Sequence, residues 1–271
     1  MQLSNLTSRI LVALVAIPAI IYVTLIGGIP FFLFVLAISI LSLIELYKIS
    51  EKKGCFPQYV FGIIGLITIE FLFFLDSLYL IMAIIVFTIL SLLIELFRNK
   101  GSAFFNIGAT LFGTLYLGLS LGSLMLIRKT FSNEGKIIIA IFASIWMCDT
   151  AAYFVGKKFG KHKMFVRVSP NKTWEGGTAG FFASIIIMVI AQKFFFQDSI
   201  ITIAQSLIIG TIIGVFGQLG DFIESLFKRD AGVKDSSHFI PGHGGVWDRF
   251  DSLIFVSPII AIFLYLMAHF K

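Results

Sequence analysis

The chain has 271 residues, of which 58% are hydrophobic and only 13% are charged. A soluble globular domain carries about 25% charged residues, so this composition excludes an ordinary soluble domain and indicates an integral membrane protein. The formal net charge is +6. Its basic residues gather in loops of the C-terminal half without a recognisable nucleic-acid-binding module, which favours an anionic substrate at the membrane over nucleic acid.

Hydropathy predicts an all-α polytopic membrane protein with about nine transmembrane helices, because a helix needs about 20 mostly apolar residues to cross the hydrocarbon. The apolar runs are continuous and do not alternate with period two, which argues against a transmembrane β-barrel. We expect a single integral membrane domain over 1–271, with N-terminal helices over 1–130 and catalytic helices and cytoplasmic loops over 136–271. The nine predicted helices are 10–27, 30–47, 59–75, 77–97, 103–127, 136–156, 176–196, 200–227 and 252–270.

The distribution of basic residues predicts the orientation of these helices. With the N-terminus in the cytoplasm, sixteen of the 21 Lys and Arg residues fall on the cytoplasmic side and five on the other. This bias agrees with the positive-inside rule. We therefore expect a multi-pass protein of the cell inner membrane, with its active site facing the cytoplasm.

Two short segments of the N-terminal half resemble each other. LIELYK (Leu43–Lys48) and LIELFR (Leu93–Arg98) both close a predicted helix with a glutamate three residues before a base. An interfacial glutamate beside a snorkelling base explains the pattern, and a duplicated helical hairpin is the alternative. Glu70 lies inside an apolar run, and an acid within the membrane is a functional hypothesis by default.

The first polar cluster of the C-terminal half is WMCDTAAYFVGKKFGKHK, which holds Asp149 and four lysines. An ionised aspartate deep in a span costs a few kcal/mol or more unless it is paired or hydrated. Asp149 is therefore either part of a polar site or a residue that packs helices together, next to an ordinary positive-inside loop.

The second cluster is VSPNKTWEGGTAGFF. Ser-Pro-Asn predicts a turn, after which Lys172 or Thr173 leads into a helix with Glu175 in its first turn, where a carboxylate suits the helix dipole. Lys172 beside a free helix N-terminus would hold a phosphate. The alternative is a capped helix start with a packing face, since the glycines permit close approach between helices. Those glycines are Gly176, Gly177 and Gly180.

The third cluster extends from Gly217 to Ser252. On a helix, Asp221, Glu224, Ser225 and Lys228 share one face, because they lie three, four and seven residues apart. Such a face must line a polar cavity rather than contact lipid. After a glycine-rich loop, Asp248 and Asp251 also lie three apart at the start of the last helix. One or two carboxylates together with substrate phosphates commonly hold Mg2+, although helix capping would explain one of these aspartates equally well.

The third cluster closely resembles the C-terminal motif of phosphatidate cytidylyltransferases (CDP-diacylglycerol synthases) of the bacterial type. That motif runs S-x-x-K-R-x4-K-D and then P-G-H-G-G-x-x-D-R-x-D, and SLFKRDAGVKD with PGHGGVWDRFD matches it at every charged position. The segments SPNKTWEG and DTAAYFVGKKFGKHK also resemble family segments, so the clear likeness covers residues 145–255. The matching residues are Ser225, Lys228, Arg229, Lys234, Asp235, Pro241, Gly242, His243, Gly244, Gly245, Asp248, Arg249 and Asp251.

The resemblance implies a nucleotidyltransferase of phospholipid biosynthesis that makes CDP-diacylglycerol and pyrophosphate from CTP and phosphatidate. It further implies a required Mg2+, a K+ ion near it, a homodimer and contact with membrane lipid, and no nucleic-acid partner. We expect Asp221 and Asp248 to hold metal, with Asp251 and Asp149 as further ligands or neighbouring acids. The expected catalytic residues are Asp221, Lys228, Arg229, His243, Asp248 and Arg249. The expected substrate-binding residues are Lys172, Ser225, Lys234, Asp235, Gly244 and Gly245.

Two other functions compete with this interpretation. A secondary transporter for an anionic solute also buries acids and bases at broken helices, but it does not need two aspartate pairs beside a basic, glycine-rich loop. A lipid kinase that uses CTP is a closer alternative, and it would move only the γ-phosphate. The labelled product therefore separates these possibilities.

Overall fold

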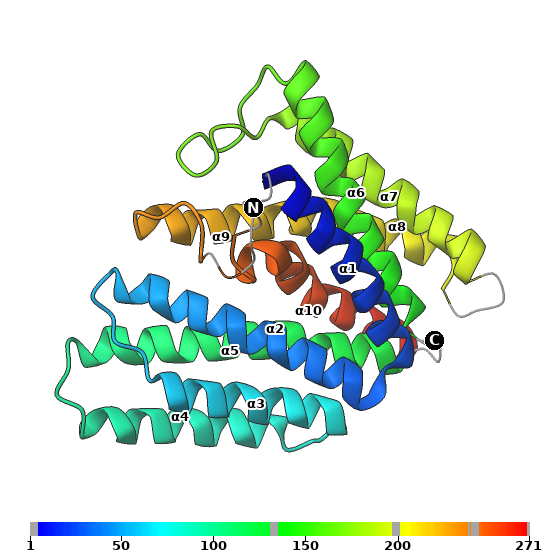
Figure 1. The fold of residues 1–271 in the computed structure, drawn as a ribbon. Coiled ribbons are helices and arrows are strands. Elements are labelled where there is room, and N and C mark those ends of the chain that lie inside the picture. Colours follow the sequence, from blue (N-terminus) through cyan, green and yellow to red (C-terminus); the bar gives the residue numbers. More distant parts are fainter. Residues whose placement is uncertain (1–4, 131–134, 197–200, 238, 240–243, 270–271) are drawn as a thin grey trace. The chain divides into compact units, whose positions relative to one another are not determined.

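The computed structural model describes residues 5–130, 135–196, 201–237, 239 and 244–269 (Figure 1). Within these residues the regular structure is helical, apart from isolated bridge residues at Lys163, Thr173 and Gly244, of which Lys163 and Thr173 pair with each other in antiparallel fashion. The elements are α1 (Asn5–Ile26), α2 (Gly28–Glu51), α3 (Tyr59–Leu75), α4 (Leu80–Leu96), α5 (Ala103–Thr130), α6 (Lys136–Phe159), α7 (Trp174–Phe195), α8 (Ile203–Ile212), the π-helical turn η1 (Ile213–Gly217), α9 (Gln218–Asp230) and α10 (Trp247–His269).

Each predicted apolar segment coincides with a helix, with α8, η1 and α9 together forming the eighth. Among the described residues, six helical stretches are long and apolar enough to cross a membrane, and three apolar helices are shorter. At about 1.5 Å per residue, α3 and α4 with 17 residues each reach about 26 Å, slightly less than a hydrocarbon core of about 30 Å. The protein is an all-α, multi-pass membrane protein, while the number of nine spans stays a prediction.

The chain forms two compact units. The first contains Met1–Leu126 with Phe227–Phe250, and the second contains Ile127–Leu226 with Asp251–Lys271. The boundaries fall inside α5, α9 and α10, so each of these helices contributes residues to both units. The predicted division into N-terminal helices over 1–130 and catalytic helices over 136–271, within one membrane domain, stays a prediction.

The first unit contains α1 to α4 and most of α5, together with the end of α9 and the start of α10 (Figure 1). Tyr47 of α2 is fully buried, and its hydroxyl lies 3.0 Å from the carbonyl oxygen of Thr110 and 2.8 Å from Oγ1 of Thr114 on α5. Gly113 lies beside the same ring, where a Cβ would come within 2.7 Å of it. A polar contact and a small residue therefore hold α2 close to α5.

Helix α7 packs against α6 and α8 in the second unit. A Cβ at Gly176 would lie 2.6 Å from the carbonyl oxygen of Ala152, and one at Gly180 would lie 2.8 Å from that of Cys148. These distances confirm the predicted close approach of helices at Gly176 and Gly180. The predicted helix start is also confirmed, because Thr173 is the N-cap of α7 and its hydroxyl accepts a hydrogen bond from the Gly176 amide.

The last helix begins earlier than hydropathy predicts. Its predicted range starts at 252, whereas α10 starts at Trp247. The charged residues Asp248, Arg249 and Asp251 lower the local hydropathy without opposing a helix. Hydropathy measures suitability for lipid, and this first turn is helical and polar at the same time.

Candidate functional site

A hairpin between α6 and α7 positions the basic residues of the second unit. The Met164 amide donates to the Lys172 carbonyl at 3.1 Å, and the Trp174 amide donates to the His162 carbonyl at 2.9 Å. The ring nitrogen Nδ1 of His162 lies 2.7 Å from a carboxylate oxygen of Glu175 in the first turn of α7. These contacts hold the segment carrying Lys172 against the N-terminus of α7.

This hairpin and the ends of α6, α7 and α9 enclose a cavity of about 520 Å³. Three lysines and two aspartates give it mixed charge, and glycines of α6 and α7 form part of its wall. Ligand pockets commonly have volumes of about 300–1,000 Å³, so the cavity can accept a nucleotide-sized molecule. The charged lining residues are Asp149, Lys157, Lys163, Lys172 and Asp221.

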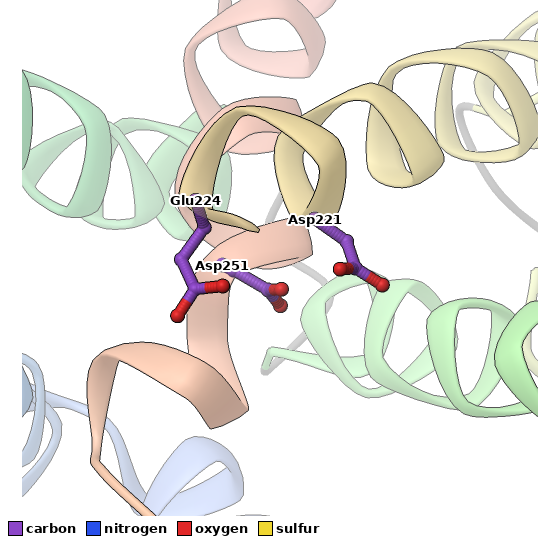
Figure 2. A group of neighbouring side chains, drawn as sticks. All are labelled: Asp221, Glu224 and Asp251. Carbon is purple, nitrogen blue, oxygen red and sulfur yellow. The ribbon is translucent and has the colours of Figure 1, made fainter. Parts of the chain in front are cut away.

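Three acidic side chains meet beside this cavity. Asp221 and Glu224 extend from one face of α9, and Asp251 reaches the same place from α10 (Figure 2). Each offers a carboxylate oxygen, and the three oxygens lie within 4.8 Å of one another. Ionised carboxylates at this spacing repel each other, and oxygen ligands of this kind suit a hard cation such as Mg2+.

Local packing brings α9 and α10 together at these acids. A Cβ at Gly220 would lie 2.9 Å from the carbonyl oxygen of Asp251 and 2.7 Å from Cβ of Phe255. The hydroxyl of Ser252 also donates to the Gly217 carbonyl at 3.0 Å. The small residue before Asp221 thus lets the two helix backbones approach until their carboxylates meet.

Lys172 connects the cavity with the acidic cluster. Its ammonium group forms an ion pair with Asp221, and the same group lies 4.4 Å from the ring centre of Phe222. Asp221 also accepts a hydrogen bond from the Ser225 hydroxyl at 3.4 Å. Asp221 is therefore shared between a lysine that lines the cavity and two further acids.

Asp248, which the sequence predicts to hold metal together with Asp221, lies in the first unit. Oδ1 of Asp248 accepts a hydrogen bond from Lys228 Nζ at 2.7 Å, and Oδ2 accepts from the amides of Ser236 at 3.1 Å and Gly245 at 2.8 Å. Asp248 thereby connects Lys228 at the end of α9 with Ser236 and Gly245, which lie near the two ends of the loop before α10.

The remaining predicted residues of the first unit lie around this loop. The exposed Arg229 donates to the Val233 carbonyl at 3.0 Å, and Lys234, Asp235 and Arg249 are exposed. Gly244 has a left-handed φ of +85°, and a Cβ there would lie 2.9 Å from Oδ2 of Asp248. His243 lies outside the described residues.

The predicted site residues thus fall into two described groups. Asp149, Lys172, Asp221, Ser225 and Asp251 belong to the second unit, whereas Lys228, Arg229, Lys234, Asp235, Gly244, Gly245, Asp248 and Arg249 belong to the first. A single site that joins Asp221 to Asp248 stays a prediction.

Sequence reasoning did not assign Glu224 to the metal site. Its spacing of three residues from Asp221 had placed it on the same helix face, so the signal was present in the sequence. What could not be read was the approach of Asp251, because that depends on the packing of α10 against Gly220. Gln218 was also missed, although it lines the cavity and donates to the Gly177 carbonyl at 3.0 Å.

Comparison with known proteins covers nearly the whole chain. Residues 7–267 match the model of the cytidylyltransferase family. A protein of Staphylococcus haemolyticus named phosphatidate cytidylyltransferase is 35% identical over 263 residues, which are 96% of this chain and 99% of that protein. Proteins of the same name from Staphylococcus aureus and Bacillus subtilis are 34% and 33% identical, covering 94% and 97% of this chain and 98% and 99% of their own lengths. The chain belongs to the cytidylyltransferase family of membrane nucleotidyltransferases.

Proposed function

We propose that the protein catalyses the Mg2+-dependent transfer of a cytidylyl group from CTP to phosphatidate, giving CDP-diacylglycerol and pyrophosphate. The family match and the names of the full-length relatives support this proposal. One observation carries this proposal: Asp221 lines the lysine-rich cavity and also belongs to the acidic cluster. A nucleoside triphosphate needs both cations for its phosphates and acids for its metal ion.

The cavity suits the phosphates of CTP. Lys157, Lys163 and Lys172 line it together with the N-terminal turn of α7 at Thr173 and Gly176. Lysine ammonium groups and helix N-terminal amides both stabilise anions. We assign Lys172 to the phosphates because it lies next to the acids that would hold the metal ion.

The chemistry requires no protein nucleophile. A phosphomonoester has a second pKa of about 6, so the phosphate of phosphatidate is already an anion at neutral pH. One of its oxygens forms a bond to the α-phosphorus of CTP. The bond from that phosphorus to the bridging oxygen of the β-phosphate breaks, and pyrophosphate leaves with the electron pair. The protein brings two anions together and offsets the charge of the departing pyrophosphate, which positioned lysines accomplish.

Asp221, Glu224 and Asp251 fit the requirements of Mg2+. Their three carboxylates offer only oxygen ligands, and few protein ligands suffice because substrate phosphates and waters complete the octahedron. When bound, Mg2+ would stabilise negative charge on the phosphate oxygens. Asp149 and Asp248 remain proposed as further acids of the metal site, and Lys228, Arg229, Lys234 and Arg249 as phosphate-binding residues.

The proposal includes the cellular setting. The basic loops support a bacterial inner-membrane location with the active site facing the cytoplasm. A K+ ion near Mg2+ and a homodimer are carried over from the family resemblance alone.

The test is an assay of purified protein with phosphatidate, Mg2+ and CTP labelled in the base. Cytidine label should enter the organic phase and pyrophosphate should accumulate. An Asp221→Asn variant prepared identically should show at least about tenfold less transfer, which excludes a contaminating host enzyme.

Parallel assays distinguish the competing functions. Transfer of only the γ-label of CTP to lipid would show a lipid kinase. Exchange of a labelled anion across liposomes without CTP consumption would show a transporter. Either result, without cytidine in the lipid, would overturn the proposal.

A further inference from the structure

The repeated LIEL segments of the N-terminal half contain two buried glutamates with different partners. Glu95 accepts hydrogen bonds from Gln58, Arg98 and Asn106, and its ion pair with Arg98 agrees with the predicted glutamate–base pair. Glu45 is equally buried, with 4% of its surface exposed. Its hydrogen bonds lead to residues about 190–200 positions later in the chain.

The Glu45 carboxylate accepts four hydrogen bonds from the loop that precedes α10. Oε1 accepts from the Val246 amide at 3.0 Å and from the Ser237 hydroxyl. Oε2 accepts from the Trp247 amide at 2.8 Å and from the Ser236 hydroxyl at 2.8 Å. One side chain of α2 therefore binds both described ends of the loop, and each of its oxygens bonds one donor from each end.

The neighbouring residues fit around this carboxylate. A Cβ at Gly245 would lie 1.8 Å from Oγ of Ser236 and 2.5 Å from Oε2 of Glu45, so the loop can close on Glu45 only with glycine at this position. The first amides of a helix have no acceptor within the helix, so Glu45 satisfies the amides of Val246 and Trp247 at the start of α10, and a carboxylate suits the positive end of the helix dipole. Asp248 binds the same two loop ends through the amides of Ser236 and Gly245.

We propose that Glu45 is a positioning residue for the cytidylyl-transfer site: it fixes Ser236–Ser237 against Gly245–Trp247 and thereby orients the charged residues that flank them. Lys234 and Asp235 directly precede the first pair, and Asp248 and Arg249 directly follow the second. A small displacement of substrate-binding groups lowers enzyme activity by up to about 100-fold. The expected effect on turnover rests on the proposed function. The hydrogen bonds of Glu45 are independent of it.

The test compares Glu45→Gln with Glu95→Gln, a matched loss of charge at the corresponding position of the other LIEL segment. Glutamine has one acceptor oxygen where the carboxylate has two, and its amide group cannot accept from the Val246 or Trp247 amide. Glu45→Gln should lower kcat/KM for CTP by about 10- to 100-fold. Hydrogen exchange measured by mass spectrometry should become about tenfold faster or more in peptides that cover Val246 and Trp247. Glu95→Gln should leave exchange in these peptides unchanged, even where its melting temperature falls equally.

A second variant keeps the test independent of the folding of Glu45→Gln. Replacing both Ser236 and Ser237 with alanine removes two of the four donors and leaves α2 intact, and it should produce the same local increase in exchange with a smaller loss of kcat/KM. Wild-type exchange and wild-type kcat/KM in folded Glu45→Gln, or wild-type exchange in the double alanine variant, would overturn the proposal. If the unmodified protein transfers no cytidylyl group, the proposed function fails, and the exchange measurements still decide whether Glu45 holds the loop.

Discussion

Lys172 forms an ion pair with Asp221, although the two residues lie on different elements and 49 positions apart in the chain. Without substrate, the lysine offsets charge on one of three clustered acids. Because Lys172 also lines the cavity, the same ammonium group would lie beside a phosphate bound there. The pair therefore connects the proposed binding of CTP with the proposed binding of metal.

Replacing Lys172 with glutamine should lower kcat/KM for CTP by about 10- to 100-fold, because a hydrogen bond to a charged group contributes about 1.5–3 kcal/mol. Initial rates of base-labelled CTP incorporation over a range of CTP concentrations measure the effect. Lys193→Gln provides the control, since this exposed lysine lies in the last turn of α7 and away from the cavity lining. Equal losses in the two variants would contradict a specific role for Lys172.

Removing one acid of the cluster should raise the Mg2+ concentration needed for half-maximal activity. We expect an increase of at least about tenfold for Asp221→Asn, Glu224→Gln and Asp251→Asn, because even residues that only position metal ligands change metal affinity by about 10- to 100-fold. Activity should also disappear with EDTA and return with added Mg2+. A Mg2+ titration of each variant checks this, and an unchanged midpoint in all three would exclude the cluster as the metal site.

Asp248→Asn separates two roles for that residue. The sequence predicts a metal ligand, whereas in the structure the Asp248 carboxylate accepts hydrogen bonds from Lys228 and from the amides of Ser236 and Gly245. We expect lower turnover, with faster amide exchange around Gly245 because an asparagine retains only one acceptor oxygen. Normal Mg2+-dependent turnover in the folded variant would show that the metal assignment of Asp248 is wrong.

The substitution Gly176→Ala should push α6 and α7 apart at their contact and lower the stability of the protein. The added Cβ would lie 2.6 Å from the Ala152 carbonyl oxygen, so backbone has to move, and we expect a loss of about 1–3 kcal/mol in the free energy of unfolding. Thermal unfolding in detergent measures it. Gly108→Ala in α5 is the matched control because a Cβ there meets nothing within 4 Å, and the helix propensity of alanine should leave stability unchanged or higher. Equal destabilisation by both substitutions would contradict the close-packing explanation.

The sequence predicted local properties better than long-range contacts. Continuous apolar runs located the helices because burial in lipid demands length and hydropathy, and the Thr173 cap and helix glycines were readable because their effects are local. The partners of Glu45 were not readable, since a base three residues away offered a simpler explanation and the true donors lie near the other end of the chain. Glu224 was placed on the correct face of α9, but its role depends on where Asp251 arrives.

The π-helical turn between α8 and α9 also left no signal in hydropathy. A π-helical turn contains about one residue more than an α-helical turn. Each residue of a regular α-helix rotates the following side chains by about 100°. If Ile213–Gly217 adopted regular α-helical geometry with the same residues, every side chain after this segment would rotate by about 100°, and Asp221 and Glu224 would turn away from Asp251 with every acid still present. The geometry of the acidic cluster therefore depends on the wide turn in this apolar segment, whereas deleting one residue there would restore a regular turn and leave the acids on nearly the same face.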